Sequence, residues 1–132
     1  MGNEAKAIRS FGKGGFSMAV IQVTEDNFDE VVMKSEKPVL LDFYADWCGP
    51  CKMMSPTVEA IAEKYADRYV VGKVNVDEQP GLALRYQVMS IPMLVTMNLG
   101  MFAAKSIGVV SETEVLELLS KAEGMRDQHV ES

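Results

Sequence analysis

The chain has 132 residues, a formal net charge of −6 at pH 7 and a hydrophobic content of 48%. This length suits one domain with a core of its own, and the acidic charge argues against a general nucleic-acid-binding protein, which presents a basic face. No segment approaches the roughly 20 apolar residues of a membrane-spanning helix, and the N-terminus lacks the continuous apolar run of a secretory signal. We therefore expect neither a membrane protein nor an exported one.

Residues 1–17 differ in composition from the rest of the chain. They are rich in glycine and charged residues and show no apolar periodicity. A vector-derived leader and a disordered native extension both fit; we favour the leader, expect it to be mobile and exclude it from the fold. The domain is expected to span residues 18–124, followed by a polar C-terminal tail at 125–132.

Apolar patterning over the domain predicts alternating strands and helices. The predicted strands cover residues 20–23, 39–44, 69–76, 92–97 and 102–107. The predicted helices cover residues 24–34, 50–65, 80–86 and a last segment that follows residue 111. Pro56 should kink the second helix, a Ser111-x-x-Glu114 capping box should begin the last helix, and Gly124 should end it. This order predicts an α/β fold, a mixed sheet with helices on both faces.

The two cysteines of the chain both lie in Trp47-Cys48-Gly49-Pro50-Cys51, between the buried strand 39–44 and the next helix. Such a pair could be half of a zinc site, but structural zinc needs four Cys or His ligands and the chain has only two cysteines and one histidine. It could be a structural disulfide, but closing so short a loop contributes only about 2 kcal/mol, against about 3 kcal/mol for a fifteen-residue loop. The spacing favours reversible thiol–disulfide exchange.

The two cysteines are expected to have different roles. Pro50 suits the first turn of a helix, because proline lacks an N–H group and has a fixed φ. Cys48 then lies at the helix N-terminus, where unpaired N–H groups and the helix dipole stabilise a thiolate. Cys51 lies on the same side one turn in and is more shielded. We therefore expect an exposed attacking thiol at Cys48 and a resolving thiol at Cys51, with Gly49 giving the turn its freedom.

The segment Trp47-Cys48-Gly49-Pro50-Cys51-Lys52 after a strand, with Ile91-Pro92 about forty residues later, resembles the thioredoxin family over residues 20–122. The resemblance implies a thioredoxin-like fold and a monomeric protein-disulfide reductase that binds no cofactor and no metal. Its partners would be disulfide-containing proteins and a flavoprotein thioredoxin reductase that supplies electrons from NADPH. Two cysteines without a larger disulfide framework fit a reducing cytosol, so we expect a cytoplasmic protein. A thioredoxin-like binding or structural module without turnover is the alternative, which the retained Cys48, Cys51 and Asp42 disfavour.

Asp42 interrupts the apolar strand that leads to the cysteines. If its side chain points inward without a partner, its pKa is raised, and it could act as a general acid/base for Cys51 through a water. From the residues alone Asp42 could equally face solvent, and Lys73 could be a surface charge. The resemblance favours the functional interpretation for Asp42, which matches the buried aspartate of the family. It leaves both interpretations open for Lys73, which matches the nearby lysine.

Ile91-Pro92 is expected to be trans from the sequence alone, because only a few per cent of X-Pro bonds are cis in folded proteins. The resemblance implies the opposite, a cis-proline that faces the dithiol and beside which the backbone can pair with an extended substrate segment. Trp47 could be an ordinary core tryptophan, but beside an exposed thiol we expect it to shield that thiol. The predicted docking rim consists of Trp47, Ser90, Ile91, Gly108 and Val109.

Several positions depart from the family pattern. Met93 stands where threonine is usual, Ser90 replaces a common glycine, and Tyr44 replaces a frequent tryptophan. Because the chain has ten methionines, soft filling of gaps in the core is the favoured explanation. A partner-specific apolar tip formed by Leu99 and Met101 is the alternative. These departures bear on the choice of partner and not on the chemistry.

Overall fold

The computed structural model describes residues 19–131, and side chains are described for residues 19–125. The predicted leader at 1–17, and the side chains of nearly all of the predicted tail, lie outside the described residues. The elements in chain order are β1 (Val20–Gln22), η1 (Asp29–Met33), β2 (Val39–Tyr44), α2 (Gly49–Lys64), β3 (Val70–Asn75), α3 (Pro80–Arg85), β4 (Met93–Asn98), β5 (Met101–Ile107) and α4 (Glu112–Glu131).

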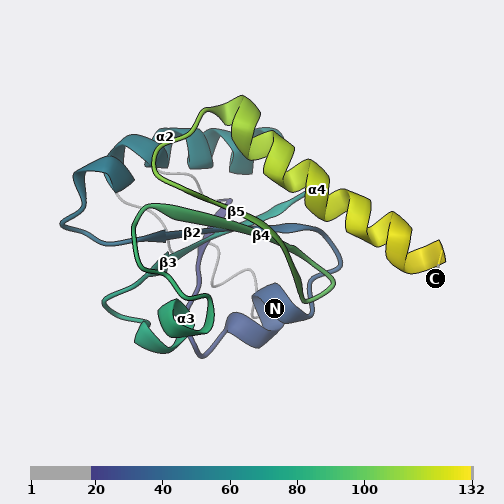
Figure 1. Cartoon of the computed structure of the whole chain (residues 1–132), viewed down its shortest axis with the longest axis horizontal. Coiled ribbons are helices and arrows are strands. Elements are labelled where there is room, and N and C mark those ends of the chain that lie inside the picture. The colour runs from purple at the N-terminus through teal and green to yellow at the C-terminus, as the bar shows by residue number, and fades with distance from the viewer. Residues whose placement is uncertain (1–18, 132) are drawn as a thin grey trace.

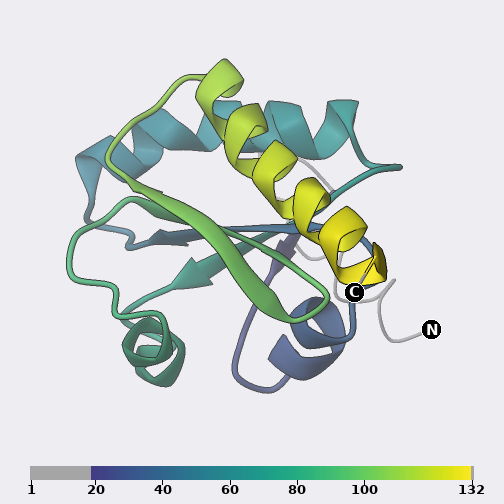
Figure 2. The same cartoon turned by 45° about the vertical axis from the view of Figure 1, so that its right-hand side comes forward.

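The strands form a mixed sheet in the order β1-β3-β2-β4-β5. β1, β3 and β2 run parallel, whereas β4 is antiparallel to both β2 and β5. Helices α2 and α4 cover one face of the sheet, and η1 and α3 cover the other (Figures 1 and 2). The predicted fold class is confirmed. Because β4 runs against β2 and β3, the start of β4 lies at the same edge of the sheet as the carboxyl ends of those two strands.

Strand β2 lies at the centre of the sheet and is buried on both faces, as its continuous apolar run predicts. Leu40 packs into the apolar layer between the sheet and helices α2 and α4, which also contains Met54 and Ile61 of α2. Leu41 and Phe43 point to the other layer, against η1 and α3. All of these side chains are fully buried. The site at the carboxyl end of β2 is therefore supported by a strand fixed from both sides.

Helix α4 is tied to strand β4, the neighbour of the central strand β2, by two hydrogen bonds from buried side chains. The Thr96 hydroxyl donates to the carbonyl oxygen of Leu118 at 2.9 Å, and the Asn98 side-chain amide donates to the carbonyl oxygen of Ala122 at 2.9 Å. Because Leu118 and Ala122 are one helical turn apart, the two bonds lie along one side of the helix.

The predicted capping box of α4 is confirmed. The Ser111 hydroxyl accepts the N–H of Glu114 at 3.1 Å, and the Glu114 carboxylate accepts the N–H of Ser111 at 2.8 Å. The prediction that Gly124 ends this helix is wrong, because α4 continues to Glu131. A glycine inside a helix costs only about 1 kcal/mol relative to alanine. Gly124 is also not among the described glycines with positive φ, so it does not form a helix cap.

The helix predicted over residues 24–34 is much shorter in the structure, a single π-helical turn at Asp29–Met33. The side chain of Asn27 explains the difference. Its carbonyl accepts the N–H of Thr24 at 2.8 Å, and its amide donates to the carbonyl oxygen of Gln22 at 3.0 Å. These local bonds hold the chain after β1 in a turn and compete with helix formation.

Two further boundaries bear on the predictions. Helix α2 contains Pro56 and continues past it to Lys64, and the kink expected at this proline stays a prediction. The hairpin between β4 and β5 has a two-residue turn, because Asn98 pairs with Met101; the predicted strands, 92–97 and 102–107, leave both of these residues in the connection. Leu99 and Gly100, the turn residues, have φ of 56° and 78°, which is the conformation that tight hairpins require.

Candidate active site

Cys48 and Cys51 form a disulfide at the N-terminus of α2, with their Cα atoms 5.3 Å apart. Cys48 is the N-cap residue, with extended backbone, and Pro50 stands in the first turn. The Sγ of Cys48 accepts the backbone N–H of Cys51 at 3.2 Å. The sulfur of Cys48 therefore occupies the position of a capping side chain, at the positive end of the helix dipole.

Both cysteines are buried, with exposed fractions of 4% for Cys48 and 3% for Cys51. The expectation that Cys48 is the exposed member of the pair is therefore wrong for the disulfide form. The pair packs against Ala45 and the partly buried Ile91, whose carbonyl oxygen lies 3.9 Å from the Sγ of Cys48. The two sulfurs differ instead in position, since Cys48 precedes the helix and Cys51 lies within its first turn.

The Ile91-Pro92 peptide bond is cis, as the resemblance implies and against the expectation from the sequence alone. Pro92 is buried and directly precedes β4, and its carbonyl oxygen accepts the N–H of Gly108 at 2.8 Å. This bond ties the segment with Gly108 and Val109 to the segment that contacts the disulfide. The antiparallel pairing of β2 with β4 brings Pro92 to the same edge of the sheet as Cys48.

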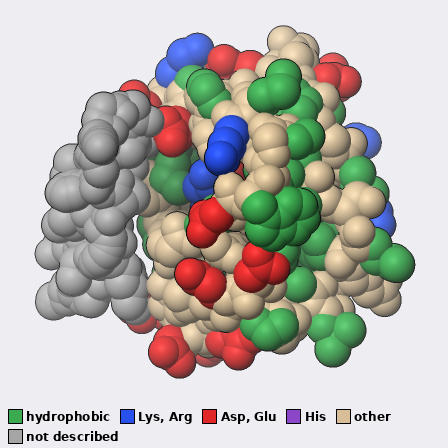
Figure 3. All heavy atoms as spheres, turned by 90° about the vertical axis from the view of Figure 1, so that its left-hand side faces the viewer, with side chains coloured by type: hydrophobic (Ala, Val, Ile, Leu, Met, Phe, Trp, Pro, Cys, Tyr) green, Lys and Arg blue, Asp and Glu red, His purple; other side chains and the backbone are tan. Residues whose placement is uncertain are grey.

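Trp47 is 71% exposed, and its indole N–H donates to the carboxylate of Asp77 at 2.9 Å. The core interpretation of this tryptophan is therefore wrong. Of the other predicted rim residues, Ser90 and Val109 are exposed, and Ile91 and Gly108 are half-buried. Figure 3 shows this end of the molecule, where hydrophobic side chains form a broad area beside acidic ones. Asp77 was not predicted, although it follows β3, whose carboxyl end lies beside that of β2.

Asp42 is fully buried in β2, and neither of its carboxylate oxygens has a hydrogen-bond partner among the described residues. The solvent-facing alternative is therefore wrong. Burial raises the pKa of Asp42 from 3.8 to about 6, and the positive charge of Lys73 offsets part of this increase. A carboxyl with this pKa can hold or release a proton close to neutral pH.

Lys73 is the register partner of Asp42 in the parallel pair β2–β3. Its ammonium group donates to the Ser55 hydroxyl at 2.9 Å and lies 4.5 Å from the centre of the Tyr44 ring. Lys73 thus lies close to Asp42 without a hydrogen bond to it. Ser55 was not predicted; its position in α2, one turn after Cys51, is the signal that could have found it.

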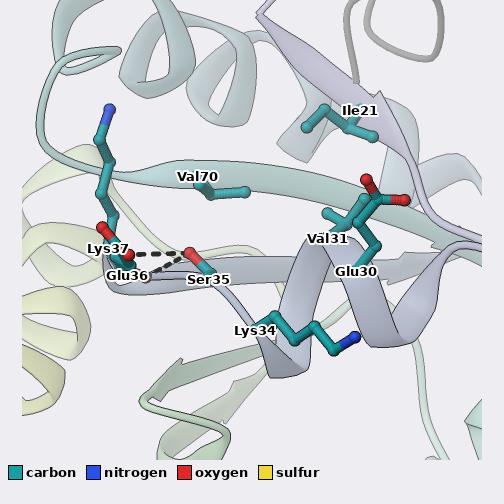
Figure 4. Close-up of a pocket in the computed structure, with 8 residues that line it drawn as sticks. All are labelled: Ile21, Glu30, Val31, Lys34, Ser35, Glu36, Lys37 and Val70. Atoms are coloured by element: carbon teal, nitrogen blue, oxygen red, sulfur yellow. Dashed lines mark hydrogen bonds between the residues drawn. The ribbon is translucent and has the colours of Figure 1, made fainter. Parts of the chain in front are cut away.

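A pocket of about 160 Å³ lies among these residues, with Cys51, Ser55, Lys73 and Tyr44 in its wall. Because a water occupies about 30 Å³ of liquid volume, the pocket has room for water beside Cys51. A second pocket, of about 320 Å³, lies away from the disulfide, between β1, η1 and the start of β3. Its wall combines the apolar side chains of Ile21, Val31 and Val70 with charged side chains from residues 30–37, and none of the predicted site residues lines it (Figure 4).

The model of the thioredoxin family matches residues 19–121. The chain belongs to the thioredoxin family. It is 44% identical to the thioredoxin of Acidithiobacillus ferridurans over 103 residues, which cover 78% of this chain and 95% of that protein. It is 43% identical to the thioredoxin of Allochromatium vinosum over 103 residues, 78% of this chain and 96% of the relative. With the thioredoxin of Porphyra purpurea it shares 42% identity over 104 residues, 79% and 97% of the two chains.

Membership of the thioredoxin family establishes the activity. The chain is a protein-disulfide reductase that acts by dithiol–disulfide exchange, with Cys48 and Cys51 as the redox-active pair. Thioredoxins use this disulfide as their redox group and carry no cofactor; their partners are disulfide-containing proteins and a reductase. Among residues 19–125, whose side chains the structure describes, no group of His, Cys, Asp and Glu is arranged to hold a metal ion. No helix among residues 19–131 is long and apolar enough to cross a membrane.

Proposed function

We propose that Cys48 is the attacking thiol and Cys51 the resolving thiol of this reductase. The observation that carries the assignment is the hydrogen bond from the Cys51 N–H to the Sγ of Cys48, at the N-cap of α2. In the reduced protein the same N–H group and the helix dipole would stabilise a thiolate at Cys48. Cys51 lies inside the first turn of α2, one turn after Cys48 and close enough to form a disulfide with it.

The reaction then has two exchanges. The Cys48 thiolate attacks one sulfur of a substrate disulfide, forms a mixed disulfide and releases the other substrate sulfur as a thiolate. Cys51 loses its proton and attacks the Sγ of Cys48, which breaks the mixed disulfide and forms the Cys48–Cys51 disulfide. The substrate leaves with both sulfurs reduced, having gained two electrons and two protons.

Asp42 is proposed to take the proton of Cys51 through a water. The pocket of about 160 Å³ has room for water beside Cys51 and Lys73, although Asp42 itself does not line it. Its burial without a hydrogen-bond partner and its pKa of about 6 support this role, because such a carboxylate is a base at neutral pH. Lys73 is proposed as a positioning residue that tunes the charge of Asp42. The Ser55 hydroxyl holds the Lys73 ammonium group, and the Lys73 charge acts on Asp42 across the register pair.

Substrates are proposed to dock on the rim of Trp47, Ser90, Ile91, Gly108 and Val109. The exposure of Trp47 and the contact between Ile91 and Cys48 support this surface. The backbone beside Pro92 is proposed to pair with an extended substrate segment.

The remaining parts of the proposal concern the protein in its cell. We propose a cytoplasmic monomer, recycled by a flavoprotein thioredoxin reductase with electrons from NADPH. The absence of a disulfide framework beyond the Cys48–Cys51 pair supports a reducing compartment. The match of the family model to residues 19–121 supports a domain at 18–124.

The assignment of the two thiols is tested by substitution of each cysteine with serine. Cys48→Ser should abolish the reduction of insulin disulfides. Cys51→Ser should attack once and then stall, because no thiol remains to displace the substrate from Cys48. That variant should accumulate a mixed disulfide, visible as an intact-mass increase under non-reducing conditions and lost on addition of dithiothreitol.

The control is the double variant, Cys48→Ser with Cys51→Ser, which should bind no substrate covalently. If Cys48→Ser traps substrate instead of Cys51→Ser, the roles are reversed. If both single variants turn over like the parent protein, neither sulfur has the proposed role.

A further inference from the structure

Met89 is 92% exposed, the largest exposed fraction among the large hydrophobic side chains of residues 19–125. The local backbone explains why. After α3 the chain turns through Gln87, which has a φ of 54°, and directs the half-buried Val88 to the core. Met89 and Ser90 then face solvent before Ile91 returns to the disulfide. The exposure of Met89 therefore follows from how the chain enters the active site.

Met89 lies close to the redox centre. Two residues of extended chain span at most about 7 Å, and Ile91, two residues on, has its carbonyl oxygen 3.9 Å from the Sγ of Cys48. The residue also adjoins Ser90 of the docking rim. A flexible thioether side chain at this place can adapt to differently shaped partners. Met89 thus adds an exposed apolar side chain next to the docking rim.

We propose that Met89 is an oxidation site, and that conversion of its thioether to a sulfoxide by a hydroperoxide weakens the docking of protein disulfides. The proposal rests on the docking surface described under the proposed function. The thioether sulfur attacks one peroxide oxygen, the O–O bond breaks and an S–O bond forms. The sulfur loses two electrons, and the second peroxide oxygen leaves as water when the oxidant is hydrogen peroxide. Methionine sulfoxide reductases reverse the change.

The consequence for docking follows from polarity. A sulfoxide is polar and strongly hydrated, so its burial beneath a substrate costs free energy that a thioether does not require. The effect is confined to docking, because Met89 forms no bond with either cysteine. The chain also provides internal references. Met54 in α2 is fully buried and Met93 in β4 is 1% exposed, so both are shielded from peroxide.

The first experiment maps the oxidation. The disulfide form is treated with hydrogen peroxide, so that no free thiol competes, and the reaction is stopped with catalase at intervals. Peptide mass spectrometry follows the gain of one oxygen atom at each methionine. Met89 should be oxidised at least about tenfold faster than Met54 and Met93, in line with its exposure. Oxidation of Met89 no faster than these buried residues overturns the proposal.

The second experiment measures the functional effect as the ratio of kcat/KM after and before peroxide treatment. For insulin disulfides this ratio should fall about fivefold, equivalent to about 1 kcal/mol of lost binding. For the small disulfide dithiobis-nitrobenzoate, which needs little docking, it should stay near one. In Met89→Leu, a substitution that nearly conserves side-chain volume, the loss towards insulin should disappear.

Two control variants test whether the loss of activity is specific to oxidation of Met89. Met53, 67% exposed in α2, and Met101, 40% exposed at the start of β5, are the exposed controls. Met53→Leu and Met101→Leu should lose activity on oxidation as the parent protein does. If either of them is protected and Met89→Leu is not, the assignment to Met89 is wrong. An equal loss with both substrates after treatment also overturns the proposal, since it indicates damage to the dithiol chemistry.

Failure of this inference can be distinguished from failure of the proposed function. If the untreated protein reduces insulin and oxidation of Met89 does not change its kcat/KM, only the inference fails. If the untreated protein does not reduce insulin, the proposed function and the docking part of the inference both fail. The mapping experiment tests the oxidation itself in either case.

Discussion

The buried carboxyl of Asp42 should make the stability of the disulfide form decrease as pH rises. Its pKa is about 6 in the folded protein and 3.8 when unperturbed, so the folded state holds the proton more tightly than the unfolded state. Below pH 3.8 Asp42 is protonated in both states, and its full contribution to the free energy of unfolding is present. Between 3.8 and about 6 the unfolded state ionises first, and stability is lost. At about 1.36 kcal/mol per pKa unit, the loss is complete above the folded pKa and amounts to about 3 kcal/mol.

Asp42→Ala removes the contribution of this carboxyl to the pH dependence of stability. The substitution also leaves a small cavity, but the cost of the cavity does not change with pH. The informative quantity is therefore the stability difference between the variant and the parent protein at two pH values. Between about pH 4 and about pH 8 this difference should shift by 2 to 3 kcal/mol, roughly, in favour of Asp42→Ala.

The assay is urea unfolding of both proteins in the disulfide form at the two pH values, followed by circular dichroism. Leu40→Val serves as the control, since Leu40 lies two residues earlier in β2, shares the same face and is fully buried. Its destabilisation, about 1 kcal/mol, should be equal at both pH values, because no titratable group is changed. If the stability difference of Asp42→Ala is also independent of pH, the carboxyl does not titrate with a raised pKa, and its proposed role as a base loses its basis.

Two further predictions concern the fold. Gly72→Ala should lower the free energy of unfolding by 1 to 3 kcal/mol, roughly, because the added Cβ would lie 2.5 Å from a Val23 methyl carbon. Gly124→Ala, with nothing within 4 Å of the added Cβ and a helical setting, should instead raise it by up to about 1 kcal/mol; urea titrations that give both variants the same sign would contradict this account. Ser111→Ala should cost about 1 kcal/mol through loss of the capping box, and an unchanged melting temperature would count against a role for that cap.

Much of the fold could be predicted because its signals are local. The apolar run of β2 identifies a strand buried on both faces, and Pro50 marks the first turn of α2. Where the prediction of a helix boundary failed, the cause was a local interaction that competed with the helix or a helix penalty too weak to end it. The side chain of Asn27 bonds its own backbone neighbours and shortens the first helix to one turn. The helix penalty of Gly124 was too small to stop α4, which ends beyond it.

The residues of the candidate site also differ in whether the sequence predicts them. The spacing of Cys48 and Cys51 before a helical pattern predicts a redox pair. The break at Asp42 in an apolar strand leaves a buried and a solvent-facing carboxyl equally open, and the family resemblance favours the buried one. The position of Ile91 against the disulfide depends on the antiparallel pairing of β2 with β4, which no local pattern encodes. Met89 was missed for the same reason, because its exposure is set by the tertiary arrangement. The spacing from Cys51 could have indicated Ser55, but not its bond to Lys73, which joins two elements distant in the sequence.

The two hydrogen bonds between β4 and α4 also limit how the core can be assembled. An amphipathic helix can slide along an apolar sheet with little change in buried area, so hydrophobic burial alone selects its position weakly. A slip of α4 by less than a full turn would separate the Thr96 hydroxyl and the Asn98 amide from their carbonyl partners. Each unpaired buried group would then cost 1 to 3 kcal/mol, roughly, against a total stability of about 5 to 15 kcal/mol for a typical domain. Thr96 and Asn98 of β4 therefore fix the position of α4 along the sheet, because they penalise misaligned packings that the apolar contacts would tolerate.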